Sequence, residues 1–160
     1  MHDSALRAHL LELLHMGHAH LKPEAAVKGL AFEYWGRRPA GAPHTPWQLL
    51  EHLRFTQWDI LNFSRNPEYV EPAWPDDYWP KEEAPKTPAE LTKSLEQFRA
   101  DLEAMQALVE NPKTDLFAKI AWGNGQTILR EAMLVADHNA YHLGQLVLVR
   151  QLLGQWPAQS

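Results

Sequence analysis

Residues 87–112 read TPAELTKSLEQFRADLEAMQALVENP, a stretch that predicts one long amphipathic helix. Thr87 and Glu90 stand three residues apart with Pro88 between them, which is a typical helix N-terminus. The apolar side chains that follow recur at alternating spacings of four and three residues, the period of one helix face. They are Leu91, Leu95, Phe98, Leu102, Met105 and Val109. Asn111 and Pro112 then end the helix.

Three further helices are predicted around this one. Thr45, Pro46 and Gln48 repeat the N-terminal capping pattern, and the helix they begin extends to about residue 65. The last helix begins near residue 127 after a glycine-rich turn and extends to residue 153, and the first covers about residues 3–20. No strand is predicted, so the fold class is all-α, a four-helix bundle.

The connection between the second and third helices is unusually long. Residues 67–88 contain six of the twelve prolines of the chain, together with two tryptophans and two tyrosines, so they cannot form a helix. A connection of this length lets the chain return along the bundle and start the next helix in the same direction. The sequence therefore predicts a Pro/Trp-rich crossover between helices 2 and 3.

Length and composition limit the classes of function. A chain of 160 residues and 18.4 kDa predicts a single domain, residues 1–160. The net charge is −5 without a basic cluster, so nucleic acid is not an expected partner. No stretch is long and apolar enough to span a membrane and no secretion signal is evident, so we expect a cytoplasmic protein. Because the chain has no cysteine, a metal ion would need His, Asp or Glu ligands.

Histidines in the predicted helices form a candidate metal site. His138 and His142 lie four residues apart, hence on one helix face, and His52 lies among leucines in the middle of the second helix. Imidazoles placed in this way can share one divalent ion. From spacing alone, the alternative is that all three are ordinary helical histidines with satisfied hydrogen bonds.

The sequence resembles the DinB/YfiT-like superfamily, whose members are regarded as metalloenzymes. The resemblance rests on LLEHLR (49–54) and DHNAYHLGQ (137–145), and it extends to WPDDYWP (74–80). It implies an up-down-down-up bundle and a metal ion bound by His52, His138 and His142. It also implies, as the leading class of reaction, transfer or isomerisation with a low-molecular-weight thiol such as bacillithiol or mycothiol.

Three further polar residues are candidates for the surroundings of the triad. Glu131 and Gln145 fall near the helical stripe of His138 and His142, and Asp59 lies two turns beyond His52. Each is a candidate to receive the far ring N–H of a ligand, and Glu131 is also a candidate general base or fourth ligand. The alternative for each is a solvated residue at the end of the bundle.

Two apolar features complete the predictions. Trp74, Tyr78 and Trp79 of the crossover are expected either to line a substrate site or to pin the crossover to the bundle, and packing is favoured. The last helix carries more apolar residues between 143 and 153 than one buried stripe requires, which predicts a homodimer unless the surplus is buried within the chain. Tyr141 is expected in the core, and His15, His18 and His20 are expected to be solvated at a helix end.

The expected function is that of a metal-dependent enzyme acting on a small molecule. Three neutral imidazoles leave a divalent ion its full charge and an open position, where a thiol or water can bind, which is the arrangement of a catalytic site. The resemblance implies an S-transferase or isomerase, and a hydrolase remains open if water is the nucleophile. Zinc is preferred, and nickel, iron or manganese would also accept these ligands. The alternatives are a stress-associated bundle with a structural metal ion, and a metal-free binding protein.

Overall fold

The computed structural model describes residues 2–156 and contains five α-helices and one 3₁₀ helix. They are α1 (His2–His15), α2 (Pro23–Val27), η1 (Phe32–Tyr34), α3 (Pro46–Arg65), α4 (Pro88–Glu110) and α5 (Ile128–Leu152). Within residues 2–156 there is no strand, only an isolated antiparallel bridge between Lys119 and Thr127. The all-α class is thus confirmed. No helix in this range is long and apolar enough to cross a membrane.

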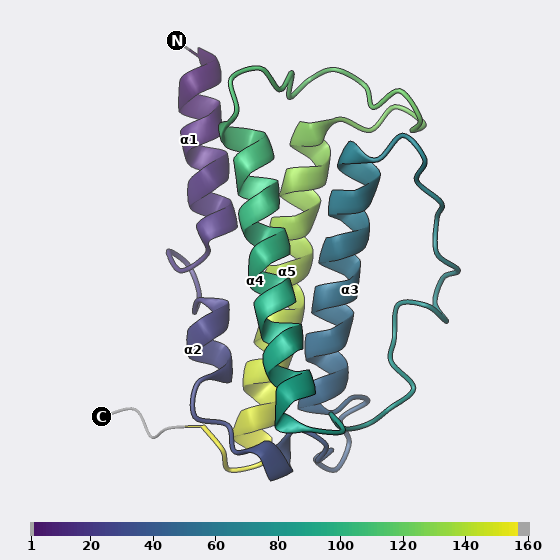
Figure 1. The fold of residues 1–160 in the computed structure, drawn as a ribbon. Coiled ribbons are helices and arrows are strands. Elements are labelled where there is room, and N and C mark those ends of the chain that lie inside the picture. Colours follow the sequence, from purple (N-terminus) through teal and green to yellow (C-terminus); the bar gives the residue numbers. More distant parts are fainter. Residues whose placement is uncertain (1, 157–160) are drawn as a thin grey trace.

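The long helices lie side by side, with α1 and α5 running down the view of Figure 1 and α3 and α4 running up. Helix α5 contacts each of the other four α-helices, and α3 packs against both α4 and α5. The segment between α3 and α4, residues 66–87, descends along the outside of α3 (Figure 1). We call this segment the strap. Because of it, α3 and α4 start at the same end of the molecule.

Threonine side chains begin all three of the longest helices. The Thr45 hydroxyl accepts a hydrogen bond from the backbone N–H of Gln48 at 3.1 Å, and the Gln48 side chain accepts one from Thr45 N–H at 3.1 Å, which forms a capping box. Thr87 and Thr127 cap α4 and α5 in the same way, without the reciprocal bond. The Thr45 hydroxyl also donates to the backbone carbonyl of Glu83 at 2.7 Å. This bond fastens the end of the strap to the start of α3.

The first helix is shorter than its sequence predicts. Helix α1 ends at His15, and the predicted end near residue 20 is wrong. Met16 and Gly17 have φ values of 55° and 111°, in the left-handed region that ends a helix. Glycine adopts this conformation without steric cost, and no apolar residue after Met16 continues the buried face of α1.

The main core lies at the end of the bundle away from α2. It is formed by the buried faces of α1, α3, α4 and α5, together with Leu116 and Ile120 of the loop before α5. Leu14, Leu61, Met105 and Val109 are completely buried in it. Since Met105 and Val109 belong to the series read from residues 87–112, the predicted face of that helix is indeed the buried one.

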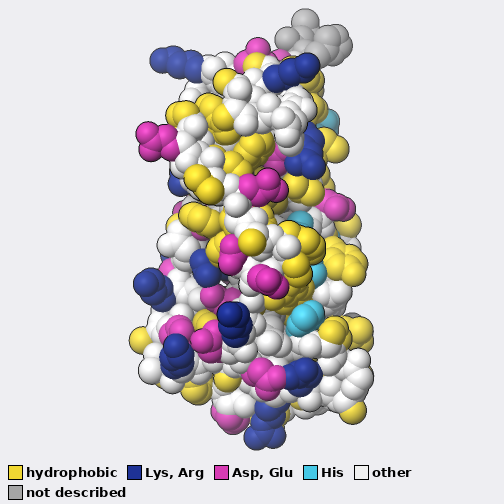
Figure 2. All heavy atoms as spheres, turned by 90° about the vertical axis from the view of Figure 1, so that its right-hand side faces the viewer, with side chains coloured by type: hydrophobic (Ala, Val, Ile, Leu, Met, Phe, Trp, Pro, Cys, Tyr) yellow, Lys and Arg dark blue, Asp and Glu magenta, His cyan; other side chains and the backbone are white. Residues whose placement is uncertain are grey.

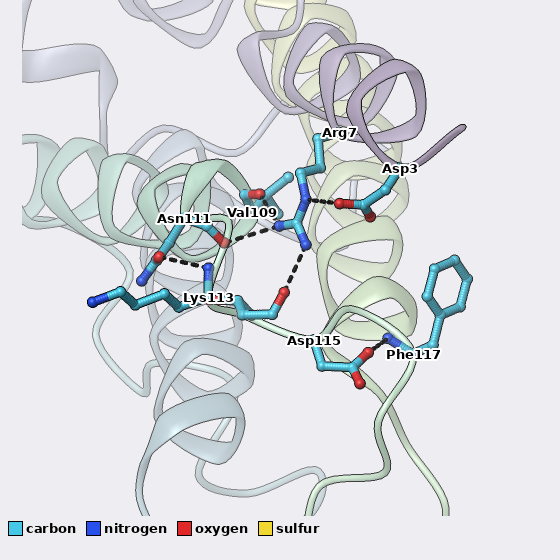
Figure 3. Close-up of polar contacts among 8 residues, drawn as sticks. Asp3, Arg7, Val109, Asn111, Lys113, Asp115 and Phe117 are labelled. Carbon is cyan, nitrogen blue, oxygen red and sulfur yellow. Dashed lines mark hydrogen bonds and ion pairs between the residues drawn. The ribbon is translucent and has the colours of Figure 1, made fainter. Parts of the chain in front are cut away.

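An arginine of α1 satisfies the backbone at the end of α4 (Figure 3). The guanidinium of Arg7 donates to the carbonyl oxygens of Val109, Asn111 and Thr114 at 2.6, 3.1 and 2.6 Å, and to the Asp3 carboxylate at 2.8 Å. The last carbonyls of a helix have no partner within the helix, so these bonds replace water. They join α1 to the loop that follows α4.

Candidate metal centre

Three imidazoles from two helices converge on one point. His52 extends from α3, and His138 and His142 extend from successive turns of α5, which packs against α3. The Nε2 atom of His52 lies 3.1 Å from Nε2 of His138 and 3.1 Å from Nε2 of His142. All three donor atoms lie within 4.8 Å of one another, and the structure thereby brings together the three residues singled out in the sequence.

Hydrogen bonds at the outer nitrogens of His52 and His142 determine which nitrogen of each ring carries the proton. His52 Nδ1 lies 2.8 Å from the backbone oxygen of Tyr78, and His142 Nδ1 lies 2.8 Å from Oε1 of Gln145. Both oxygens are acceptors, so each Nδ1 donates a proton in this hydrogen-bond network. In the neutral rings, each Nε2 then carries a lone pair that is directed at the point where the three rings converge.

Two lone pairs that face each other 3.1 Å apart cannot share a hydrogen bond, and a cation is needed between them. Protonation does not supply it near neutral pH, because burial lowers the pKa of His52 to about 4 and that of His138 to about 3. A divalent ion bound at about 2.0–2.1 Å from each imidazole nitrogen fits this spacing. The donor set therefore suits a metal ion.

The third ring lacks such a partner at its outer nitrogen. Nδ1 of His138 is buried and makes no hydrogen bond to any residue from 2 to 156. Oδ1 of Asn139, the next residue along α5, is also buried without a partner, while its Nδ2 donates to Gln57 at 2.7 Å. Thus two of the three outer nitrogens are fixed by acceptors within the described chain.

An aromatic stack covers His52 from the side of the strap. The Trp79 ring lies parallel to the His52 ring, with centroids 3.8 Å apart and an interplanar angle of 6°. The His44 ring also stacks on Trp79, with centroids 3.8 Å apart. Trp79 thus contacts a candidate ligand directly. The sequence analysis missed His44, since a histidine in a loop before a helix carries no periodic signal.

Asp59 and Glu131 lie on one cavity, away from the ligand nitrogens. This cavity of about 460 Å³ is bounded by α3, the strap, the loop before α5 and α5 itself. The Asp59 carboxylate accepts hydrogen bonds from the hydroxyls of Tyr69 and Tyr78 at 2.9 and 2.7 Å, and Glu131 accepts from Arg130 at 2.7 Å. Burial raises the pKa of both carboxyl groups. No hydrogen bond within residues 2–156 joins either of them to a histidine of the triad.

Trp74 and Tyr141 are both largely exposed. Trp74 is 70% exposed and contacts the Tyr78 ring, with no ring contact to the triad among the described residues. Tyr141 is 65% exposed, so its predicted place in the core is wrong. The Tyr141 ring contacts the edge or face of the His142 ring, with centroids 4.8 Å apart, and most of the side chain faces outward, because the buried stripe of α5 occupies the inner side of the helix.

The site lies close to the surface on the side of the strap. On the face of the molecule that carries the strap, Figure 2 shows histidine side chains at the surface beside a group of hydrophobic side chains. His52 and His142 are buried, whereas His138 is half-buried.

Comparison with known proteins gives one family. A sequence model of the DinB superfamily matches residues 23–146, which include α2, α3, α4 and all three histidines of the triad. No curated protein and no solved structure matches the chain significantly.

Proposed function

The chain belongs to the DinB superfamily, and we propose that it is a metal-dependent enzyme that binds a divalent ion through His52, His138 and His142. The proposed substrates are small molecules, with a low-molecular-weight thiol or water as the nucleophile. In keeping with the family resemblance, we take the four long helices to form an up-down-down-up bundle, which agrees with their directions in Figure 1.

The observation that carries the proposal is the pair of opposed lone pairs on His52 and His142. His52 donates its one ring proton to the Tyr78 backbone oxygen, and His142 donates its ring proton to Gln145 Oε1. Burial lowers the pKa of both rings and so disfavours a second proton on either. Such a pair is costly in a protein interior unless a cation lies between the two nitrogens. A metal ion supplies this cation.

The ligand chemistry favours zinc and a catalytic role. Imidazole nitrogen is a good ligand for zinc, and nickel, iron or manganese would also accept it. When bound, the ion would lower the pKa of a thiol or water in its open position. The residues of the chain hold the three rings in place, and Trp79 excludes water from one face of His52.

Cysteine is absent from the chain, so the thiol must come from outside. We propose a cytoplasmic location, because reduced small thiols are kept in that compartment. His44 stacks on Trp79, which in turn stacks on His52, and burial lowers the pKa of the His44 imidazole below its ordinary value. A neutral imidazole at this place is a candidate to accept a proton from the incoming substrate.

Metal analysis tests the proposal. Protein produced without a histidine tag should contain about one divalent ion per chain, and His52→Ala and His142→Ala should each remove it. The metal-loaded protein should then conjugate an electrophile with at least one small thiol in a screen of several. Metal content well below one ion per chain would reject the proposal. A bound ion whose removal strongly lowers the melting temperature, with no turnover with any thiol, would favour a structural metal instead.

We also propose that two copies associate through the outer face of α5. Met133, Tyr141, Leu148 and Leu152 recur along this face and are each more than half exposed. Gly144 lies between them, and a Cβ built there would meet no atom within 4 Å, which leaves space for another helix to approach closely. Exposed apolar surface of this kind is typical of an association site.

A further inference from the structure

Asp59 is a buried carboxylate without a basic partner. It is 6% exposed, and no salt bridge reaches it from any residue between 2 and 156. Its two oxygens instead accept hydrogen bonds from two phenols, those of Tyr69 and Tyr78. Burying a carboxylate is expensive, and an apolar residue would fill this position on α3 at lower cost. The reason for a carboxylate at position 59 should therefore lie in the roles of Tyr69 and Tyr78.

Both phenols belong to the strap, and only one of them touches the metal centre. Tyr78 donates through its hydroxyl to Asp59 at 2.7 Å, and its backbone oxygen accepts the Nδ1 proton of His52 at 2.8 Å. Asp59 and His52 stand seven residues apart on α3, about 10 Å along the helix axis. Tyr78 thus spans two turns of α3, with its hydroxyl at one turn and its carbonyl at the other.

The rest of the contact between strap and site follows Tyr78 directly. Trp79, the next residue, stacks on the His52 ring at 3.8 Å. The ring of Tyr78 also packs against Phe55 of α3, with centroids 5.3 Å apart. The hydrogen bond to Asp59 therefore holds the hydroxyl end of Tyr78, whose carbonyl bonds to His52 and whose neighbour Trp79 covers the His52 ring.

We propose that Asp59 is a positioning residue for the ligand His52 and that it acts through Tyr78. With the Tyr78 hydroxyl held by Asp59, the Tyr78 carbonyl keeps the proton of His52 on Nδ1 and leaves Nε2 free to bind the metal ion. The inference rests on the proposed function in so far as His52 is a ligand. It goes beyond that function by assigning control of the ligand to a carboxylate that contacts no ligand.

A matched pair of variants separates positioning from simple attachment of the strap. Tyr78→Phe and Tyr69→Phe each remove one phenol from the same carboxylate and keep the aromatic ring. Only Tyr78 carries the carbonyl that bonds to His52. If Asp59 has a purely structural role, the two variants should affect the His52 tautomer and the metal affinity to a similar extent. If Asp59 positions His52, only Tyr78→Phe should change them.

The first measurement is the tautomer of His52 in metal-free protein, from ¹⁵N NMR of the ring nitrogens. Wild type and Tyr69→Phe should hold the proton on Nδ1, and Tyr78→Phe should show a mixture of both tautomers. Asp59→Leu should resemble Tyr78→Phe, and Asp59→Asn, which can still bond to a phenol, should lie closer to wild type. The same tautomer in Tyr78→Phe as in wild type would overturn the inference.

The second measurement is the affinity for Zn²⁺, in competition with a chelator. Tyr78→Phe should bind about 10-fold more weakly than wild type, the lower end of the usual effect of losing support behind a ligand. Tyr69→Phe should stay within about two-fold. Equal affinities of the two variants, beside tight binding by wild type, would overturn the inference and leave the proposed function intact. A wild type that binds no ion would reject the proposed function, while the metal-free tautomer would still decide the inference.

Discussion

The Nε2 atoms of His52 and His142 lie 3.1 Å apart, although the other nitrogen of each ring already holds its proton against a carbonyl oxygen. The two residues are 90 positions apart in the chain. Their approach depends on the packing of α3 against α5, and their protonation depends on the strap and on Gln145. Three parts of the molecule, α3, the strap and α5, therefore meet at one point that suits a cation.

Loss of a ligand should abolish tight metal binding. His142→Ala removes one of three nitrogen donors, and we expect the affinity for Zn²⁺ to fall about 100-fold or more, because zinc sites in proteins use at least three protein ligands. The matched control is His44→Ala, which removes a histidine of the same region that is not part of the triad. Competition with a chromogenic chelator measures both. Equal loss in the two variants would contradict the assignment of ligands.

Gln145 should tune the binding without being a ligand. Its Oε1 accepts the Nδ1 proton of His142 at 2.8 Å, so Gln145→Leu removes the support behind this ring. We expect Zn²⁺ affinity to fall about 10- to 100-fold. Gln145→Glu keeps an acceptor and makes the ring more basic, and its affinity should equal or exceed that of wild type. Isothermal titration with Zn²⁺ measures the three affinities. Weaker binding by Gln145→Glu than by Gln145→Leu would contradict the role assigned to Gln145.

The metal-free protein should lose stability on acidification because of its buried histidines. The pKa of His52 is lowered from 6.5 to about 4 and that of His138 from 6.5 to about 3, in both cases first of all by burial. Between these values and pH 6.5 the unfolded state binds more protons than the folded state. The histidine contribution to the free energy of unfolding is therefore fully present above pH 6.5 and declines as the pH falls towards 4.

Buried carboxyl groups act in the opposite direction in part of this range. Burial raises the pKa of Asp59, Asp101 and Glu131, so their contribution to stability increases as the pH falls. The informative quantity is thus the difference between wild type and His138→Gln, which keeps these three groups. Chemical denaturation in the presence of a chelator should give a shallower fall from pH 6.5 to 4 for the variant. Parallel curves would mean that His138 is not buried in its neutral form.

Arg7 should matter for stability and leave the metal site unaffected. Arg7→Met deprives three backbone carbonyls at the end of α4 of their shared donor, and we expect the free energy of unfolding to fall by about 2 kcal/mol. The bonds lie at the junction of α1 with the loop after α4 (Figure 3), and none of them involves the triad. Denaturant melts together with a Zn²⁺ titration check both statements. A large change in metal affinity would be unexpected.

The outer face of α5 should determine the oligomeric state. Leu148 is 54% exposed, and Leu148→Glu places a charge where we propose that two copies meet, so we expect monomers. Phe117→Glu is the matched control, because Phe117 is 61% exposed in the loop before α5 and outside the proposed face. Sedimentation velocity at micromolar concentrations compares the two. A monomeric wild type, or a dimer that survives Leu148→Glu, would reject this interface.

The helices could be predicted because their signals are local. Thr45, Thr87 and Thr127 each bond to a backbone N–H only three residues away, so a short stretch of sequence contains both partners. The four-residue spacing of His138 and His142 likewise fixes a common helix face. The end of α1 was the exception, where the left-handed Met16 and Gly17 stop the helix at His15, before its predicted end near residue 20.

The surroundings of the histidines depended on tertiary structure. The acceptor for His52 is the backbone oxygen of Tyr78, and a backbone oxygen is the same for every residue type, so the sequence carries no mark of it. Glu131 and Asp59 lie at the right spacing for contact with the ligands, yet they bond to Arg130 and to two tyrosines of the strap. Local periodicity places a residue on a helix face. Only the packing of the helices and the course of an aperiodic strap determine which group that face meets.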